Sequence, residues 1–253
     1  MIKILDGQQI HKSFHIDKEK IKILREVSIT IYEGEFISIM GPSGSGKSTL
    51  LYVLSGMDSF DSGEIIFNNQ RLTACGEKEL ADIRRQQMGF VFQQPAFLKN
   101  VTIMDNIVLP AMRDNRKKVK ALTTKAQQLL ESTGIGQLAS RMTNQVSGGQ
   151  LQRAGICRAL INEPKIIFGD EPTGALNSKT AEEIMDHFLQ INQEGTTIML
   201  VTHDPKVAAK SERVLFMKDG EIVDELWLGK LLQQRGMENR IEKVTRKMLR
   251  VEM

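Results

Sequence analysis

The stretch GPSGSGKST at residues 41–49 constrains this chain more than any other feature, because it contains the spacing G-x-x-x-x-G-K-[S/T]. An apolar run at residues 36–40 precedes it, and STLLYVL, whose spacing suits a helix buried against a sheet, follows. A flexible glycine-rich turn would not explain this strand–loop–helix order. The stretch therefore predicts a phosphate-binding loop made by Gly41, Pro42, Ser43, Gly44, Ser45, Gly46, Lys47, Ser48 and Thr49.

Each residue type in this loop has a physical task. Glycines let successive backbone N–H groups turn inward around phosphate oxygens. Lys47 adds a full positive charge and is a catalytic candidate, and Ser48 offers a hydroxyl group to a magnesium ion.

Two acidic residues follow the apolar run KIIFG. Asp170 ends this predicted strand, and Glu171 comes next. A strand-end carboxylate is commonly only solvated or capping, but beside a phosphate loop a magnesium role for Asp170 becomes the better hypothesis. Glu171 is then placed to orient and deprotonate an attacking water molecule.

His203 follows another apolar run, TTIMLVT. A lone histidine is more often structural. This one ends a second predicted parallel strand, at the edge where doubly wound sheets bind ligands. We therefore predict that His203 contacts the terminal phosphate and belongs to the catalytic set with Glu171.

Strands alternate with helices in both outer parts of the chain, which predicts an α/β fold with a largely parallel sheet covered on both faces. Antiparallel hairpins are expected through Asn68-Asn69 and Asp219-Gly220. From 94 to 160 the pattern is mostly helical. We expect a core of residues 1–93 and 161–229 and an inserted α-helical subdomain at 94–160.

Residues 230–253 form a separate basic stretch. Its apolar residues recur at helical spacing among lysines and arginines, which predicts a basic amphipathic helix. Two interpretations remain open: the helix packs on its own domain with a solvated basic face, or it contacts a membrane partner or anionic lipid headgroups.

Composition narrows the function classes. The net charge of +3 gives no indication of a nucleic-acid partner, and the two cysteines, Cys75 and Cys157, suggest neither a disulfide framework nor a zinc site. No apolar run approaches the roughly 20 residues that a membrane-spanning helix needs. We expect a cytoplasmic protein, so that any membrane span belongs to another chain.

Further motifs resemble the ATP-binding-cassette (ABC) ATPases over nearly the whole chain. VSGGQ at residues 146–150 is similar to the family signature LSGGQ, and Gln93 ends MGFVFQ as the family's glutamine loop does. With the phosphate loop, Asp170-Glu171 and His203, five motifs occur in the family order. The resemblance implies a P-loop NTPase core of the RecA-like type, with ATP and Mg²⁺ as cofactors and Ser48, Gln93 and Asp170 as metal ligands.

The resemblance also implies a second copy of the chain as partner. In the family two domains pair head to tail, and each signature helix points at the ATP held by the other domain. A helix N-terminus contributes only about 0.3–2 kcal/mol toward an adjacent anion, enough to bias assembly at a site that already holds lysine and magnesium. The signature residues would be Ser147, Gly148, Gly149 and Gln150. Phe14 matches the aromatic residue that stacks on adenine, although a core phenylalanine is the alternative.

One position departs from the family pattern. Many relatives carry aspartate where this chain has Asn177. That loop normally crosses the dimer interface. Asparagine keeps the hydrogen-bonding shape, and the lost charge bears on how tightly two ATP sites would be coupled.

FLKNVTIMDNIVLPAM and DEPTGALNSKT look most like the lipoprotein-release and macrolide-export branch, and within it like exporters that protect against bacitracin-type peptides. This implies an integral membrane permease as partner, a sensor kinase reached through it, and a peripheral position on the inner face of the cell membrane. Lipoprotein release, cell-envelope remodelling and a non-transport ABC ATPase are the alternatives. A regulatory module without turnover is disfavoured by the presence of both Glu171 and His203.

Overall fold

The computed structural model of the chain describes residues 2–16, 19–113, 119–231 and 236–252. Within these residues the larger sheet has six strands in the order β10-β9-β3-β8-β7-β6. The first of them is antiparallel to its neighbour, and the other five are parallel. The strands are β3 (Phe36–Met40), β6 (Met88–Phe92), β7 (Ile166–Asp170), β8 (Thr197–Val201), β9 (Arg213–Lys218) and β10 (Glu221–Trp227).

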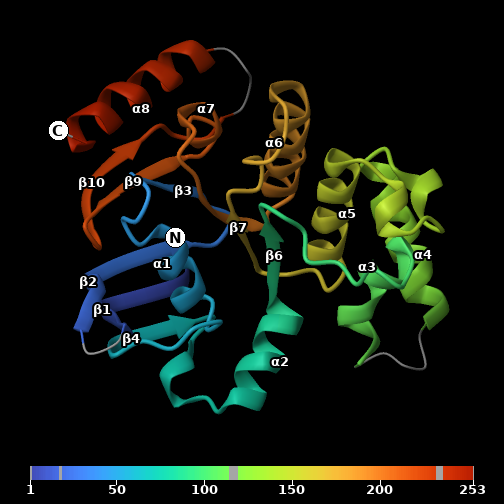
Figure 1. Cartoon of the computed structure of the whole chain (residues 1–253), viewed down its shortest axis with the longest axis horizontal. Helices are drawn as coiled ribbons and strands as arrows, with labels where there is room; N and C mark the ends of the chain where they lie inside the picture. The colour runs from blue at the N-terminus through green and yellow to red at the C-terminus, as the bar shows by residue number, and fades with distance from the viewer. Residues whose placement is uncertain (1, 17–18, 114–118, 232–235, 253) are drawn as a thin grey trace.

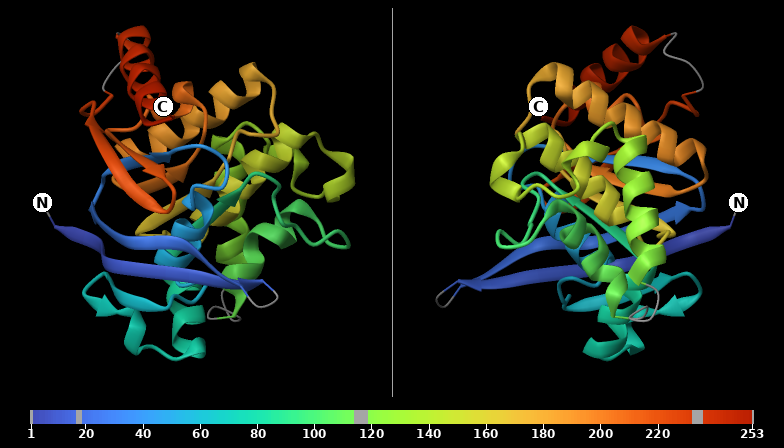
Figure 2. Two further views of the ribbon diagram at one scale, coloured as in Figure 1. Left: turned by 60° about the vertical axis from the view of Figure 1, so that its left-hand side comes forward. Right: turned by 90° about the vertical axis from the view of Figure 1, so that its right-hand side faces the viewer.

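A second, antiparallel sheet has the order β2-β1-β4-β5. Its strands are β1 (Lys3–Ile16), β2 (Glu19–Tyr32), β4 (Ser62–Phe67) and β5 (Gln70–Arg71). The long hairpin of β1 and β2 runs below the larger sheet in the left view of Figure 2. Both predicted turns are confirmed: Asn68 and Asn69 have φ of 48° and 62°, and Asp219 and Gly220 have φ of 49° and 85°.

The larger sheet is covered on both faces, as the sequence predicts. Side chains alternate along each strand, so every strand contributes side chains to the cores on both faces. In β8, Met199 and Val201 face a core shared with α1 (Lys47–Leu54) and the antiparallel sheet. Ile198 and Leu200 face the opposite core, which α5 (Gly148–Leu160) and α6 (Ser178–Gln193) cover. Figure 1 shows α1 with β1, β2 and β4, and on the other side α5 and α6.

The stretch 94–160 is mostly helical. It contains α3 (Ile103–Met112), α4 (Val119–Ser132) and α5, which share a third core, with short 3₁₀ turns at Gly136–Leu138 and Thr143–Gln145. Gly134 has φ of 72° just beyond α4, as the sequence predicts for a helix end. The helix α2 (Glu77–Gln87) lies before β6. The boundaries at 94 and 160 as limits of a subdomain remain a prediction.

The C-terminal helix α8 (Met237–Glu252) packs on its own domain. Val244 is fully buried beside Ala208 and Ala209, which lie on and next to the short helix α7 (Pro205–Ala208), and beside Val214 of β9. Of the predicted stretch 230–253, residues 232–235 and 253 lie outside the described residues. A contact of the basic face with a membrane or a partner remains a prediction.

Arg240 anchors α8 to the segment that follows His203. Its guanidinium donates hydrogen bonds to the carbonyl oxygens of Ala209 (2.7 Å), Ser211 (2.6 Å) and Leu228 (2.8 Å). Positive charge near the last carbonyl groups of α7 is favourable, because those groups carry the negative end of the helix dipole.

Candidate functional site

The loop of residues 41–49 connects the end of β3 to α1, and its backbone needs glycine at specific points. Gly46 caps α1 with φ of 98°, and a Cβ there would lie 2.9 Å from the carbonyl oxygen of Ile23. At Gly41, with φ of 156°, a Cβ would lie 2.1 Å from the carbonyl oxygen of Met217. Ser43 and Gly44 form the exposed tip of the loop. The close approach of neighbouring backbone therefore sets the loop's shape.

Lys47 is buried at the start of α1. Its Nζ atom donates hydrogen bonds to the carbonyl oxygens of Gly41 and Pro42, both at 2.9 Å. Burial lowers the pKa of Lys47, and the nearby carboxylates of Glu171 and Asp170 oppose that shift. The predicted lysine and the two predicted acids therefore lie in one electrostatic neighbourhood.

The carboxylate of Asp170 meets α1 at the carboxyl end of β7. Its Oδ1 atom accepts a hydrogen bond from Ser48 at 2.8 Å, and its Oδ2 atom accepts one from Tyr52 at 2.6 Å. The pKa of Tyr52 is raised to about 12, mainly by burial and secondly by the hydrogen bond to the charged carboxylate of Asp170. The phenol therefore keeps its proton at neutral pH. The structure thus brings together Ser48 and Asp170, which the sequence predicts as metal ligands.

Tyr52 was not among the predicted site residues. The available signal was its position four residues after Ser48, which places both side chains on one face of a helix. Nothing in the sequence indicated that this face meets Asp170.

A hydroxyl and a carboxylate are the hard oxygen donors that Mg²⁺ prefers. Within the residues that the structure describes, no group of three or more His, Cys, Asp and Glu side chains is arranged to hold a metal. Ser48 and Asp170 supply donors of this kind, and a Mg²⁺ ion held by them would need its remaining ligands from water or substrate.

Glu171 and His203 lie next to each other at the ends of β7 and β8. The Nδ1 atom of His203 is 2.9 Å from Oε1 of Glu171. The backbone of Glu171 has φ of 48°, a conformation that costs a non-glycine residue about 1–3 kcal/mol. The amide of Glu171 donates to the carbonyl oxygen of Val201 at 3.0 Å, which ties this turn to β8.

Gln93 follows β6 and is exposed. A Cβ at Gly174 would lie 2.8 Å from its side-chain nitrogen, so Gln93 covers the turn that follows Glu171. Among the described residues, no hydrogen bond joins Gln93 to Ser48 or Asp170. The structure brings Gln93 to the acidic turn and leaves its role as a metal ligand a prediction.

Phe14 lies on β1 opposite Ile21 of β2 and is 41% exposed. The Nζ atom of Lys12 is 4.8 Å from the centre of its ring. The alternative of a core phenylalanine is wrong, because a core ring would be covered by its own domain. An exposed aromatic face remains available for stacking.

The VSGGQ segment starts α5. Ser147 caps this helix: its Oγ atom accepts from the amide of Gln150 at 3.3 Å, and the side chain of Gln150 accepts from the amide of Ser147 at 2.9 Å. The hydroxyl proton of Ser147 is left for another acceptor, and Ser147 and Gly148 are exposed. Across the part of the chain that the structure describes, no hydrogen bond links this segment to residues 41–49.

Gly149 and Asn177 lie where the beginnings of α5 and α6 meet. A Cβ at Gly149 would lie 2.4 Å from Cγ2 of Thr180, whereas a Cβ at Gly148 would have only Leu176 near it, at 4.0 Å. Asn177 caps α6 by accepting from the amide of Thr180 at 3.0 Å. The asparagine thus keeps the capping geometry that an aspartate would provide.

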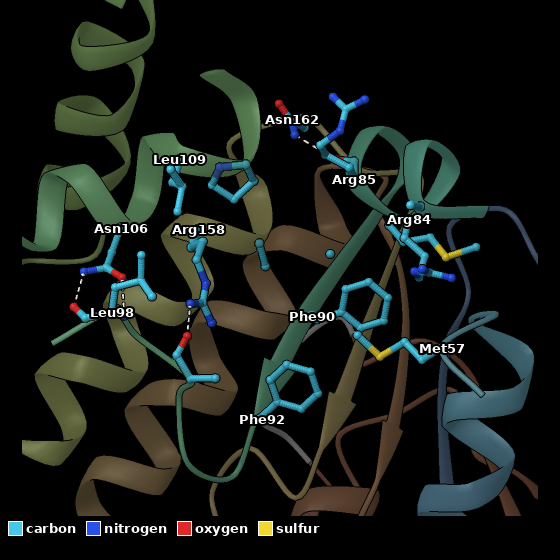
Figure 3. Close-up of a pocket in the computed structure, with 16 residues that line it drawn as sticks. Met57, Arg84, Arg85, Phe90, Phe92, Leu98, Asn106, Leu109, Arg158 and Asn162 are labelled. Atoms are coloured by element: carbon cyan, nitrogen blue, oxygen red, sulfur yellow. Dashed lines mark hydrogen bonds between the residues drawn. The ribbon is translucent and has the colours of Figure 1, made fainter. Parts of the chain in front are cut away.

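A groove of about 510 Å³ lies between β6, α2 and α3, and Phe92, the residue before Gln93, is part of its lining. Its exposed apolar residues include Met57, Leu98 and Leu109, which are 43%, 54% and 50% exposed. Arg158 points across it and donates to the carbonyl oxygen of Ala96 at 2.5 Å (Figure 3).

A helix that spans a membrane needs both sufficient length and an apolar sequence. None of the helices of the described residues combines the two to the degree that a transmembrane helix requires.

Comparison with known proteins places these features in context. The family model described as ABC transporter matches residues 24–174. The chain is 43% identical over 227 residues to the bacitracin export ATP-binding protein BceA of Halalkalibacterium halodurans, with 89% of each chain covered. It is 39% identical over 226 residues to the lipoprotein-releasing system ATP-binding protein LolD of Aquifex aeolicus, covering 89% of this chain and 99% of LolD.

A solved structure agrees with the fold. The dimeric structure of the ATP-binding cassette MJ0796 of Methanocaldococcus jannaschii, in a post-hydrolysis state bound to ADP and Pi, matches with a TM-score of 0.81 and 38% sequence identity. The match covers 90% of this chain and all of that one.

Proposed function

Because the chain belongs to the ABC transporter family and is an ABC-type ATPase, we propose that it powers a separate membrane permease that exports antimicrobial peptides or protects against them. The observation that carries the catalytic assignment is the gathering of Lys47, Asp170 and Glu171 at one sheet edge, where β7 pairs with β8 in register. The similarity to BceA, named for bacitracin export, supports the substrate class.

The proposed roles follow from the geometry. The backbone of residues 41–49 and Lys47 bind the phosphates of ATP, and Phe14 stacks on adenine. Ser48 and Asp170, with Gln93, hold Mg²⁺, which neutralises phosphate charge when bound. Glu171 takes a proton from the attacking water.

His203 holds the carboxylate of Glu171 through the 2.9 Å contact and faces the terminal phosphate. Its side chain is 70% exposed, so it can reach a ligand above the sheet edge without rearrangement of the core.

ABC cassettes form dimers and work with membrane permeases. For this chain we propose the head-to-tail arrangement, in which Ser147, Gly148, Gly149 and Gln150 of one copy face the ATP of the other. The exposure of Ser147 and its free hydroxyl proton support this arrangement. So does the lack, among the described residues, of a hydrogen bond between this segment and residues 41–49 of the same chain. Asn177 lies beside the same segment and would tune the coupling between the two sites.

We propose that the permease docks in the groove of Figure 3 and so holds the chain at the inner face of the cell membrane. The groove offers exposed apolar side chains and lies next to the residues that lead into Gln93. A permease segment bound there would contact the residues before Gln93. A displacement of Gln93 would then be transmitted to the turn after Glu171, because Gln93 packs against Gly174. A sensor kinase contacting the permease completes the proposed assembly.

A role in lipoprotein release is the second candidate, supported by the similarity to LolD. The names of these two relatives, LolD and BceA, describe a releasing system and an export protein, which favours transport over the non-transport ABC ATPases. Co-purification with an exporter-type permease, followed by peptide protection assays, separates the two candidates.

The catalytic proposal is tested with Lys47→Ala. Loss of the buried ammonium should abolish ATP binding and hydrolysis, measured with a fluorescent ATP analogue and by phosphate release. Lys206→Ala is the control, because Lys206 lies on α7 after the histidine. Near-normal nucleotide affinity in Lys47→Ala would refute the loop assignment.

The docking proposal is tested with Leu109→Asp. A charge in the groove should prevent co-purification of the permease and leave ATP binding by the isolated chain intact. Val223→Asp is the matched control, since Val223 is 47% exposed on β10 and lies outside both the groove and α8, whose basic face is a predicted contact surface. Equal permease recovery with both variants would exclude the groove.

A further inference from the structure

One helix binds both oxygens of one carboxylate. Ser48 and Tyr52, on the same face of α1, donate to Oδ1 and Oδ2 of Asp170 at 2.8 Å and 2.6 Å. Ser48 is itself a candidate metal ligand. Tyr52 has no such task among the roles assigned so far.

The hydroxyl of Tyr52 is held in place by packing. The ring packs against the core between the two sheets, which includes Phe168 of β7. The carbonyl group of Tyr52 accepts hydrogen bonds from the amides of Met57 and Asp58, at 2.8 Å and 3.1 Å, where α1 ends. Backbone and ring are therefore both restrained, and the phenol oxygen meets Asp170 from a defined direction.

We propose that Tyr52 is a positioning residue that fixes the carboxylate plane of Asp170 for Mg²⁺. A carboxylate turns readily about its last side-chain bond, and a single hydrogen bond from Ser48 leaves that rotation open. The second bond, to the other oxygen, removes it and keeps Oδ1 next to Ser48. Partners of this kind around metal ligands commonly change metal affinity by about 10–100-fold. The inference rests on the proposed function, because it takes Asp170 as a metal ligand.

The test is Tyr52→Phe, which removes one oxygen atom and keeps the ring. We expect the Mg²⁺ concentration needed for half-maximal tight ATP binding to rise about tenfold, the lower end of that range, since Ser48 remains. ATP affinity in EDTA should stay unchanged. Binding is followed by calorimetry with ATP and stepped MgCl₂. Tyr32→Phe is the matched control, because Tyr32 is the chain's other tyrosine and lies at the end of β2.

A double-mutant cycle with Asp170→Asn separates positioning from a structural role. If Tyr52 acts through Asp170, Tyr52→Phe has little further effect on the Mg²⁺ requirement in the Asp170→Asn background. An unchanged Mg²⁺ requirement in Tyr52→Phe overturns the inference. So does an equal loss of ATP affinity with and without Mg²⁺, which would mark a structural residue. ATP binding by the parent protein that ignores Mg²⁺ would instead refute the metal site itself.

Discussion

His203 approaches Glu171 with its Nδ1 atom 2.9 Å from Oε1, across the ends of two paired parallel strands. Glu171 is also held through its backbone. Its amide donates a hydrogen bond to the carbonyl oxygen of Val201, and its φ is 48°. With the carboxylate ionised, this contact requires the histidine proton on Nδ1.

Glu171→Gln should bind ATP, hydrolyse it about 100-fold or more slowly, and accumulate as a dimer. The amide keeps the shape of the side chain and cannot accept the water proton. Phosphate release and size-exclusion chromatography with MgATP measure both effects. Glu163→Gln is the matched control, since Glu163 also has positive φ, 52°, but lies before β7 on the surface. Turnover of Glu171→Gln at the parent rate would remove Glu171 from the catalytic set.

Ser147→Arg should block ATP-driven dimerisation while leaving ATP binding to the monomer intact. A long charged side chain at the exposed cap of α5 would occupy the space that a second copy needs. Light scattering of the Glu171→Gln protein, with and without this change, gives the answer. Ser132→Arg, at the exposed end of α4, should dimerise normally. A dimer that survives Ser147→Arg would exclude the proposed interface.

Gly149→Ala should lower the free energy of unfolding by about 1–3 kcal/mol, because its Cβ would lie 2.4 Å from Cγ2 of Thr180. Gly148→Ala should have a much smaller effect. Thr180→Ser removes the clashing methyl group and should restore most of the loss in the double variant. Urea unfolding of the parent protein, the two alanine variants and the double variant measures these differences in stability. Equal stabilities of the two alanine variants would contradict this packing.

Alkaline pH should destabilise the fold through Cys157. Burial raises the pKa of this thiol from 9.0 to about 11. Between these values the unfolded chain releases a proton that the folded chain keeps, so stability is full below pH 9 and falls as pH rises toward 11, by at most about 2–3 kcal/mol. In a Cys75→Ser background, Cys157→Ser should flatten this slope in urea unfolding between pH 8 and 10.5. An unchanged slope would show that another group dominates.

The local elements of the site were predictable because each motif has its own signal. Glycine spacing located the loop, apolar runs located the strands, and the rule that parallel strands share a carboxyl edge brought Asp170, Glu171 and His203 together. What remained out of reach was contact between distant segments. The bond from Tyr52 to Asp170 and the packing of Thr180 on Gly149 depend on how α1 meets β7 and how α5 meets α6. No periodicity in a single stretch encodes those approaches.

The same limit applies to the C-terminal helix. Its amphipathic pattern predicted a helix with one buried face, and two different surfaces could have covered that face. The structure shows that the chain's own α7 and β9 cover it, with Arg240 bonded to the carbonyl groups beyond α7. Charge pattern alone could not distinguish these arrangements.

The two carbonyl groups that hold the ammonium of Lys47 belong to the same loop that would receive the triphosphate. Because both acceptors are backbone atoms of that loop, the fold of the loop itself sets the position of the ammonium group. A lysine side chain placed in this way has little conformational entropy left to lose when it contacts phosphate oxygens.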